Sequence, residues 1–87
     1  MAVVFIPALL RPFIGQETTQ AEGATVAAVI DDLDRQFPGV KARLIEGTRL
    51  RPNLAVAVDG EVSPEGLKTK VDPASEVHFV LALSGGR

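Results

Sequence analysis

The sequence contains no cysteine, no tryptophan and no tyrosine, and these absences exclude several kinds of site. Without cysteine there is no disulfide, no thiolate nucleophile and no cysteine-based zinc site. Any sulfur chemistry must therefore use sulfur supplied by another molecule. Four phenylalanines are the only large aromatic residues, so the core must be aliphatic. The composition predicts one small domain with a modest, well-packed core, because a chain of 87 residues buries only about 60–65% of its unfolded surface.

The charges are nearly balanced and form no run of one sign. Nine basic and eleven acidic residues give a formal net charge of −2 and are dispersed along the chain. Such a distribution lacks the basic footprint that binds phosphate backbones, so we expect no nucleic-acid partner.

The apolar start of the chain is too short to cross a membrane. Met1–Leu10 lacks a basic n-region, is broken by Pro7 and meets Arg11, well before the length of about 20 residues that a membrane span needs. We therefore interpret it as a strand, and we expect no membrane association and a cytoplasmic location.

One long helix stands out in the apolar pattern. Thr25 is a suitable N-cap, Pro38-Gly39 ends the helix, and the apolar residues between them form a single stripe. The stripe consists of Val26, Val29, Ile30, Leu33 and Phe37. Val40, Leu44 and Ile45 predict one further short helical segment before the polar stretch Glu46–Asn53.

Strand patterns surround this helix. The expected strands are 3–6, buried on both faces and central in a sheet; 16–21, at an edge; 54–58, buried; 61–62, after an Asp59-Gly60 turn; and 77–83, largely buried. The order strand, strand, helix, strand, short strand, strand fits a β-grasp arrangement, although periodicity alone also allows a truncated ferredoxin-like layer.

Two glycines that contribute nothing to a core stand just before the last residue of the chain. Leu83-Ser84-Gly85-Gly86-Arg87 follows the last expected strand directly. Terminal glycines are often merely frayed ends. The functional interpretation is that Gly-Gly, lacking Cβ atoms, threads a narrow channel, and four extended residues span about 13 Å.

The whole chain resembles the MoaD/ThiS family of sulfur carriers. The resemblance is carried by an N-terminal strand ending in Pro7, the Thr-Val-x-x-Val-Ile-x-x-Leu helix, Val-Asp-Gly-Glu, and the closing Glu-Val-x-Phe strand before Gly-Gly. It implies an α+β fold of the ubiquitin-like β-grasp type, with a mixed sheet of four to five strands and one main helix packed across it. The implied domain is 1–83, followed by a flexible tail, 84–87.

The resemblance also implies a chemistry in which the chain is a carrier and not an enzyme. A partner of the ubiquitin-activating type, an adenylyltransferase, would use ATP to adenylate the carboxyl group of Gly86, and a sulfur donor would convert it to a thiocarboxylate. Leu83, Ser84 and Gly85 would be recognised in the partner's channel. An acceptor enzyme would then take the sulfur, and no cofactor is bound by the carrier itself.

Arg87 departs from the mature family pattern, because it ties up the carboxyl group of Gly86 in a peptide bond. We predict that a processing protease removes it, since a long charged side chain does not suit a channel shaped for glycine. The alternatives are that Arg87 is a cloning remnant, or that this chain is never activated and serves as a binding module.

The destination of the sulfur stays open at this stage. Ile6–Pro12 resembles the opening of the CysO-type carriers, which favours cysteine biosynthesis. The alternatives are a small subunit of molybdopterin synthase, a thiamine-pathway carrier, which is less favoured because such carriers are usually shorter, a ubiquitin-like protein modifier, or a β-grasp interaction domain without tail chemistry.

Other polar residues predict no catalytic or metal site. His78 is the only histidine, and a hydrogen-bonded structural role is expected for it. Asp31, Asp32 and Asp34 point in different directions on a helix and are expected to form a solvated face. Neither Ser63 nor Ser84 has the setting of a nucleophile.

Two surface features suggest partner contacts. Arg49 and Arg51 flank Leu50 in the polar stretch and are candidates for contact with an acidic partner. In the last strand, Val77, Phe79, Leu81 and Leu83 are expected to face the helix. Val80 and Ala82 then point to the other side and predict an exposed apolar patch.

Overall fold

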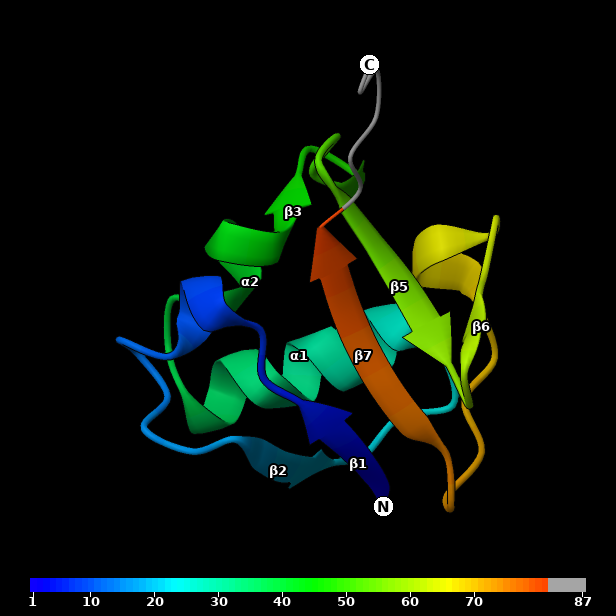
Figure 1. The fold of residues 1–87 in the computed structure, drawn as a ribbon, viewed down its shortest axis with the longest axis horizontal. Coiled ribbons are helices and arrows are strands. Elements are labelled where there is room, and N and C mark those ends of the chain that lie inside the picture. The colour runs from blue at the N-terminus through cyan, green and yellow to red at the C-terminus, as the bar shows by residue number, and fades with distance from the viewer. Residues whose placement is uncertain (82–87) are drawn as a thin grey trace.

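The computed structural model describes residues 1–81, which form a mixed five-stranded sheet with one long helix packed across one face (Figure 1). The strands are β1 (Ala2–Phe5), β2 (Thr18–Ala21), β5 (Leu54–Val58), β6 (Glu61–Val62) and β7 (Glu76–Leu81). Their order across the sheet is β2-β1-β7-β5-β6. β1 and β7 are parallel and the other neighbours are antiparallel, which is the β-grasp arrangement expected from the sequence.

The central strand is β7 and not β1, so the expected central position of the first strand is wrong. β1 lies between the edge strand β2 and β7. Its side chains alternate between buried and half-buried, so it is not buried on both faces either. A β-branched run suits any interior strand, and the pattern of one strand does not reveal its neighbours.

Helix α1 (Val26–Gln36) covers the inner face of the sheet, as its apolar stripe predicts. Thr25 has an extended backbone, and its Oγ1 accepts a hydrogen bond from the Ala28 N–H at 3.2 Å, which caps the first turn. Phe37, at the C-cap, is half-buried. The core that the helix closes is aliphatic apart from Phe79 and consists of Ala2, Val4, Ile6, Leu10, Ile14, Ala21, Val26, Val29, Ile30, Leu33, Val40, Leu44, Leu54, Val56, Val71, Val77 and Phe79.

A short hairpin follows the second helix and was not predicted. Helix α2 (Val40–Leu44) confirms the expected helical segment except at Ile45, which begins a strand. β3 (Ile45–Glu46) pairs with β4 (Arg49–Leu50) across a turn. Each strand has two residues and none of them is fully buried, so the polar stretch carries no alternating pattern to read.

The loops are anchored to the core. The 3₁₀ turn η1 (Ala8–Leu10) and the residues after it bury Leu10 and Ile14 completely. A second turn, η2 (Gly66–Lys68), leads towards β7. At the expected Asp59-Gly60 turn both residues have positive φ, 53° and 88°, and the Asp59 carboxylate accepts hydrogen bonds from the Glu76 N–H and the Ser75 hydroxyl.

The connection between β2 and α1 is tight at Gly23. A Cβ atom added there would lie 2.6 Å from the Val29 nitrogen and 2.8 Å from the Ala28 carbonyl carbon. We expect Gly23→Ala to lower the free energy of unfolding by about 1–3 kcal/mol, measured by urea titration. Gly15→Ala is the control, since an added Cβ there has no atom within 4 Å. Equal stability of the two variants would contradict this close approach.

Asp32 fastens α1 to the chain before it. Its carboxylate accepts hydrogen bonds from the Glu22 N–H at 3.0 Å, from Arg35 at 2.9 Å and from Gln36 at 3.0 Å. The Glu22 N–H, then the Arg35 guanidinium, lower the pKa of Asp32 below its usual 3.8. The charged form is thus favoured in the folded state, and the stability that it contributes is present above pH 3.8 and is lost as the pH falls through the lowered pKa.

We therefore expect Asp32→Asn to be less stable than the parent chain at neutral pH. The difference should shrink as acid protonates the native carboxylate, and thermal melts across the acidic range measure it. Glu61→Gln is the control, because the Glu61 side chain has no hydrogen-bond or ion-pair partner within residues 1–81. If the difference in stability between Asp32→Asn and the parent chain does not change with pH, the altered hydrogen-bonding geometry, and not the lost charge, explains the effect.

Candidate functional site

The predicted site residues Leu83, Ser84, Gly85, Gly86 and Arg87 lie outside the described residues, as does Ala82. The structure does describe the strand from which these residues continue, and we call its last described residue, Leu81, the base of the tail. β7 is described to Leu81, which pairs with Leu54, the first residue of β5. Because β7 is central, protein flanks this base on both sides.

The two neighbours of β7 determine what lies beside its end. β1 runs parallel to β7, with Phe5 opposite His78, so the segment that follows β1 leaves the sheet at the same end as β7 does (Figure 1). β5 runs antiparallel and begins at this end, so the β3–β4 hairpin before it lies on the other side. Two segments far apart in the sequence thus border the base of the tail.

The two faces of β7 differ in burial. Val77 and Phe79 are buried against the helix side, as expected. The prediction that the last strand is largely buried is wrong for the outward positions. Glu76 and Val80 are exposed and His78 is half-buried, because no helix covers that face. The sequence shows two apolar positions on the outer side but not that this side lacks a covering layer.

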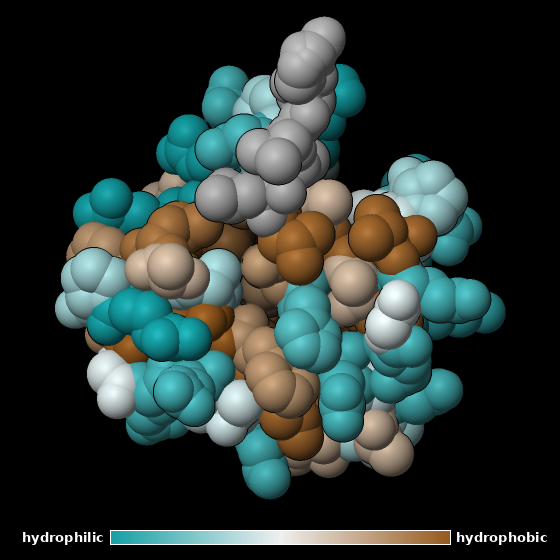
Figure 2. Space-filling view, viewed as in Figure 1, coloured by the Kyte–Doolittle hydropathy of each residue, from teal (hydrophilic) through white to brown (hydrophobic). Residues whose placement is uncertain are grey.

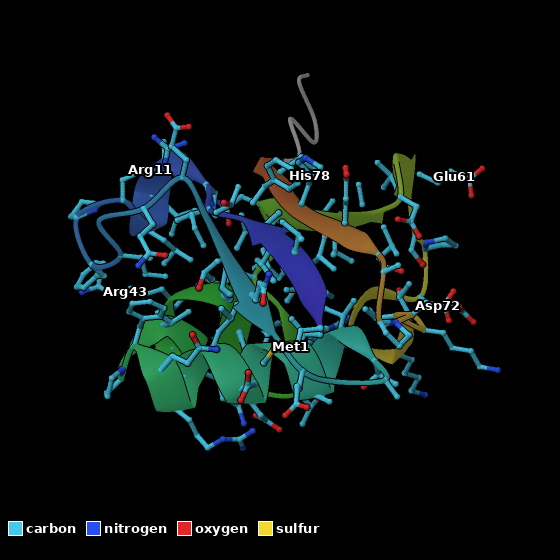
Figure 3. The ribbon with its side chains drawn as sticks, turned by 90° about the horizontal axis from the view of Figure 1, so that it is seen from below. Met1, Arg11, Arg43, Glu61, Asp72 and His78 are labelled. Atoms are coloured by element: carbon cyan, nitrogen blue, oxygen red, sulfur yellow. The ribbon has the colours of Figure 1, made fainter. Side chains whose placement is uncertain are left out.

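His78 is held by stacking. Its ring lies 4.0 Å from that of Phe5, centroid to centroid, at an interplanar angle of 9°. Figure 3 shows His78 on the side of the sheet away from α1. Within residues 1–81 the imidazole makes no side-chain hydrogen bond, so the hydrogen-bonded role expected for it is replaced by packing on Phe5.

An apolar patch covers the outer face towards the end of β7. Val80 is 38% exposed and pairs with Ala55, and Val62 on β6 is 64% exposed and pairs with Ala57. Figure 2 shows apolar side chains gathered on this face. We call Phe5, Ala55, Val62 and Val80 the sheet patch. The exposed patch predicted around Val80 is present, and its other predicted member, Ala82, is outside the described residues.

Several polar side chains elsewhere have partners within the chain. Ser63 Oγ accepts from the Glu65 N–H at 3.2 Å and from the Thr69 hydroxyl at 2.7 Å, which orders a turn. Asp31 pairs with Lys41 at 2.8 Å and raises the pKa of that lysine.

Asp34 accepts hydrogen bonds from the N–H groups of Gly39 and Lys41. With Asp32 it helps to fasten the helix, so the carboxylates are more than the solvated face expected for them. In the part of the chain that the structure describes, no three His, Asp or Glu side chains are placed to hold a metal ion. Over the same residues, no helix is long and apolar enough to span a membrane.

The two arginines of the hairpin region differ in their contacts. Arg51 donates to the Ala42 carbonyl oxygen at 2.9 Å and lies 3.5 Å from Glu46. Arg49 is exposed, and its side chain has no hydrogen-bond or ion-pair partner within residues 1–81. Both border an open groove of about 470 Å³ that reaches Leu54, the residue opposite Leu81.

The chain is similar to known proteins over nearly its whole length. The ThiS family model matches residues 4–86. The sulfur carrier protein CysO of Mycobacterium tuberculosis is 33% identical over 89 residues, which cover 95% of this chain and 96% of that protein.

Solved structures agree with this match. A chain of the Amycolatopsis orientalis BexX/CysO complex has a TM-score of 0.89 at 32% identity and covers 99% of this chain and 100% of its own length. Mycobacterium tuberculosis CysO has a TM-score of 0.85 at 31% identity, covering 94% and 99%. The small archaeal modifier protein 1 of Methanosarcina acetivorans, with a TM-score of 0.79 at 23% identity and coverage of 98% and 95%, shares the fold.

Proposed function

The chain belongs to the ThiS family of ubiquitin-like sulfur carriers, and from this premise we propose that it carries sulfur as a thiocarboxylate on Gly86. The observation that carries the proposal is that the family match runs to residue 86 and includes both glycines of the tail. The relatives named as sulfur carriers match along nearly the whole of both chains, which supports a carrier role and not a catalytic one.

The proposed chemistry has two steps. The ionised carboxylate of Gly86, with an ordinary pKa of about 3.5, attacks the α-phosphorus of ATP, and pyrophosphate leaves. Hydrosulfide, or a donor that releases it, then attacks the carbonyl carbon of the acyl-adenylate; AMP leaves, and the thiocarboxylate remains on Gly86. Catalysis belongs to a partner adenylyltransferase of the ubiquitin-activating type, because residues 1–81 contain no paired nucleophile and base.

We propose that Arg87 is removed before activation. Its peptide bond with Gly86 leaves no free glycine carboxylate, and the tail would otherwise end in a long charged side chain. Either a protease removes Arg87 or the carboxyl group of Arg87 is itself activated. A comparison of the chain that ends at Gly86 with the 87-residue chain distinguishes these two cases.

The sheet patch is the proposed docking surface for the partner. It is apolar, exposed and close to the base of the tail, so a partner bound there can receive the tail at the same time. The existence of a BexX/CysO complex supports the idea that carriers of this fold dock on partners. The CysO relatives favour cysteine biosynthesis as the destination of the sulfur.

Intact mass spectrometry tests the carrier proposal. A chain that ends at Gly86 is incubated with the cell's own adenylyltransferase, recognised by its release of pyrophosphate from ATP only when the chain is present, and with a sulfur source. We expect a gain of about 16 Da, because sulfur replaces one carboxylate oxygen. The 87-residue chain is treated in the same way and should gain no mass.

Three other outcomes have distinct meanings. A gain on both chains would show that Arg87 is tolerated. A gain on neither would overturn the carrier proposal in favour of an interaction domain, for which deletion of Gly85-Gly86-Arg87 has no consequence. Conjugates that survive a denaturing gel would show that lysine amines, and not sulfur, attack the activated glycine.

Val80→Asp tests the sheet patch. A carboxylate in an apolar interface must be desolvated, so we expect the KM of the chain in the pyrophosphate assay to rise about tenfold, with kcat little changed. Ala74→Asp adds the same charge at an exposed turn before β7 and serves as the control. Equal KM values for the two variants would rule out docking through this patch.

A further inference from the structure

Four arginines lie in the segments that follow β1 and precede β5, the two strands beside β7. Arg11 follows η1, and its Nε donates to the Ile6 carbonyl oxygen at 3.1 Å. The guanidinium of Arg43, on α2, lies 4.2 Å from the centroid of the exposed Phe13 ring. Arg49 and Arg51 lie in and after the hairpin that precedes β5. All four are exposed, and we call Arg11, Arg43, Arg49 and Arg51 the basic collar.

Several acidic residues lie at the opposite end of the two strands β5 and β7. Asp72 and Glu76 lie at the start of β7, and Asp59 and Glu61 at the turn where β5 ends. Figure 3 shows Arg11 and Arg43 on one side of the molecule and Glu61 and Asp72 on the other.

The basic collar is not a product of composition, since the chain has a net charge of −2. Its neighbourhood is not purely positive, because Glu46 pairs with Arg51, and Glu17 follows the η1 loop. The four arginines nevertheless outnumber these two carboxylates in the segments after β1 and before β5.

The length of the tail brings a partner close to this charge. Gly86 lies five residues beyond Leu81, so its carboxyl group reaches at most about 17 Å from the end of the described strand. A partner that encloses Gly86 in an active site must therefore bring the mouth of its channel to the base of the tail. The segments on both sides of that base carry the basic collar.

We propose that the basic collar is a second docking surface, which pairs with Asp and Glu side chains around the mouth of the adenylating partner's tail channel. This rests on the proposed function and adds the chemistry of the partner's surface. Guanidinium groups bind carboxylates in a planar, two-pronged geometry, and rim charges of this kind mainly speed association and fix orientation. The sheet patch supplies apolar contact, and the collar aligns the tail with the channel.

Arg49 is the residue with which to test the collar. Its side chain is exposed and has no ion-pair or hydrogen-bond partner among the residues described, so its replacement removes nothing that the fold uses. It also borders the open groove beside Leu54, where a partner's carboxylate has room to approach. Arg11 and Arg51, in contrast, each bond a backbone carbonyl oxygen.

The experiment measures the association rate of the chain with the adenylyltransferase at low and high salt. We expect Arg49→Glu to slow association about tenfold at low salt. The deficit should nearly vanish at high salt, because the Debye length falls from about 30 Å at 0.01 M to about 3 Å at 1 M. Arg49→Lys keeps the charge and should associate at the parent rate.

Lys70→Glu is the matched control. Lys70 is exposed, and it lies near Asp59 and Glu61 at the acidic end. The charge change is the same, so this variant should associate like the parent chain. An equal slowing of Lys70→Glu would show an effect of net charge only. A slower association that high salt does not restore would overturn the proposal. So would association at the parent rate for both Arg49→Glu and the double variant Arg43→Glu with Arg49→Glu.

Two further measurements separate this inference from its premise. At saturating enzyme, Arg49→Glu should still gain about 16 Da, because the reacting atoms are untouched. If the parent chain gains no mass, the carrier proposal fails and the collar proposal fails with it. If a short duplex DNA displaces the adenylyltransferase as strongly as excess parent chain does, the collar is a general polyanion site and the proposal is overturned.

Discussion

The parallel pairing of β1 with β7 is the constraint on which the rest of the structure depends. Parallel neighbours cannot be joined by a tight turn, so the chain between them must cross over the sheet, and α1 makes that crossing. The same pairing places the last described strand in the centre of the sheet. The C-terminal tail thus continues from a strand that is paired on both sides, so the base of the tail is fixed in position.

One helix can cover only one face of a five-stranded sheet. The inner face buries Val4, Val56, Val77 and Phe79 against α1, which is how an aliphatic chain of this size obtains a core. The outer face then has no covering layer, and its side chains form the sheet patch and the Phe5–His78 stack. The surface offered for docking therefore follows from the same shortage of layers that makes the domain small.

Sequence patterns predicted the parts of the fold whose periodicity is complete within one segment. The helix from Val26, the strand 54–58 and the Asp59-Gly60 turn each carry their own signal, and all are present. The order of strands depends on pairings between distant segments, so the place of β1 was wrong. The β3–β4 hairpin was missed because its two-residue strands contain no buried residue.

The site was predictable only in its covalent part. Gly85-Gly86 is a local signal, whereas Arg11, Arg43 and Arg49 are far apart in the sequence and look like dispersed surface charge until the fold places β1 and β5 beside β7. This division follows from the chemistry proposed for the tail. A reacting carboxyl group needs only a slim peptide, but partner recognition needs a surface, and a surface exists only after parallel and antiparallel neighbours have aligned their ends beside β7. Recognition therefore depends on folding far more than reactivity does, which is why the motif alone leaves the choice of partner open.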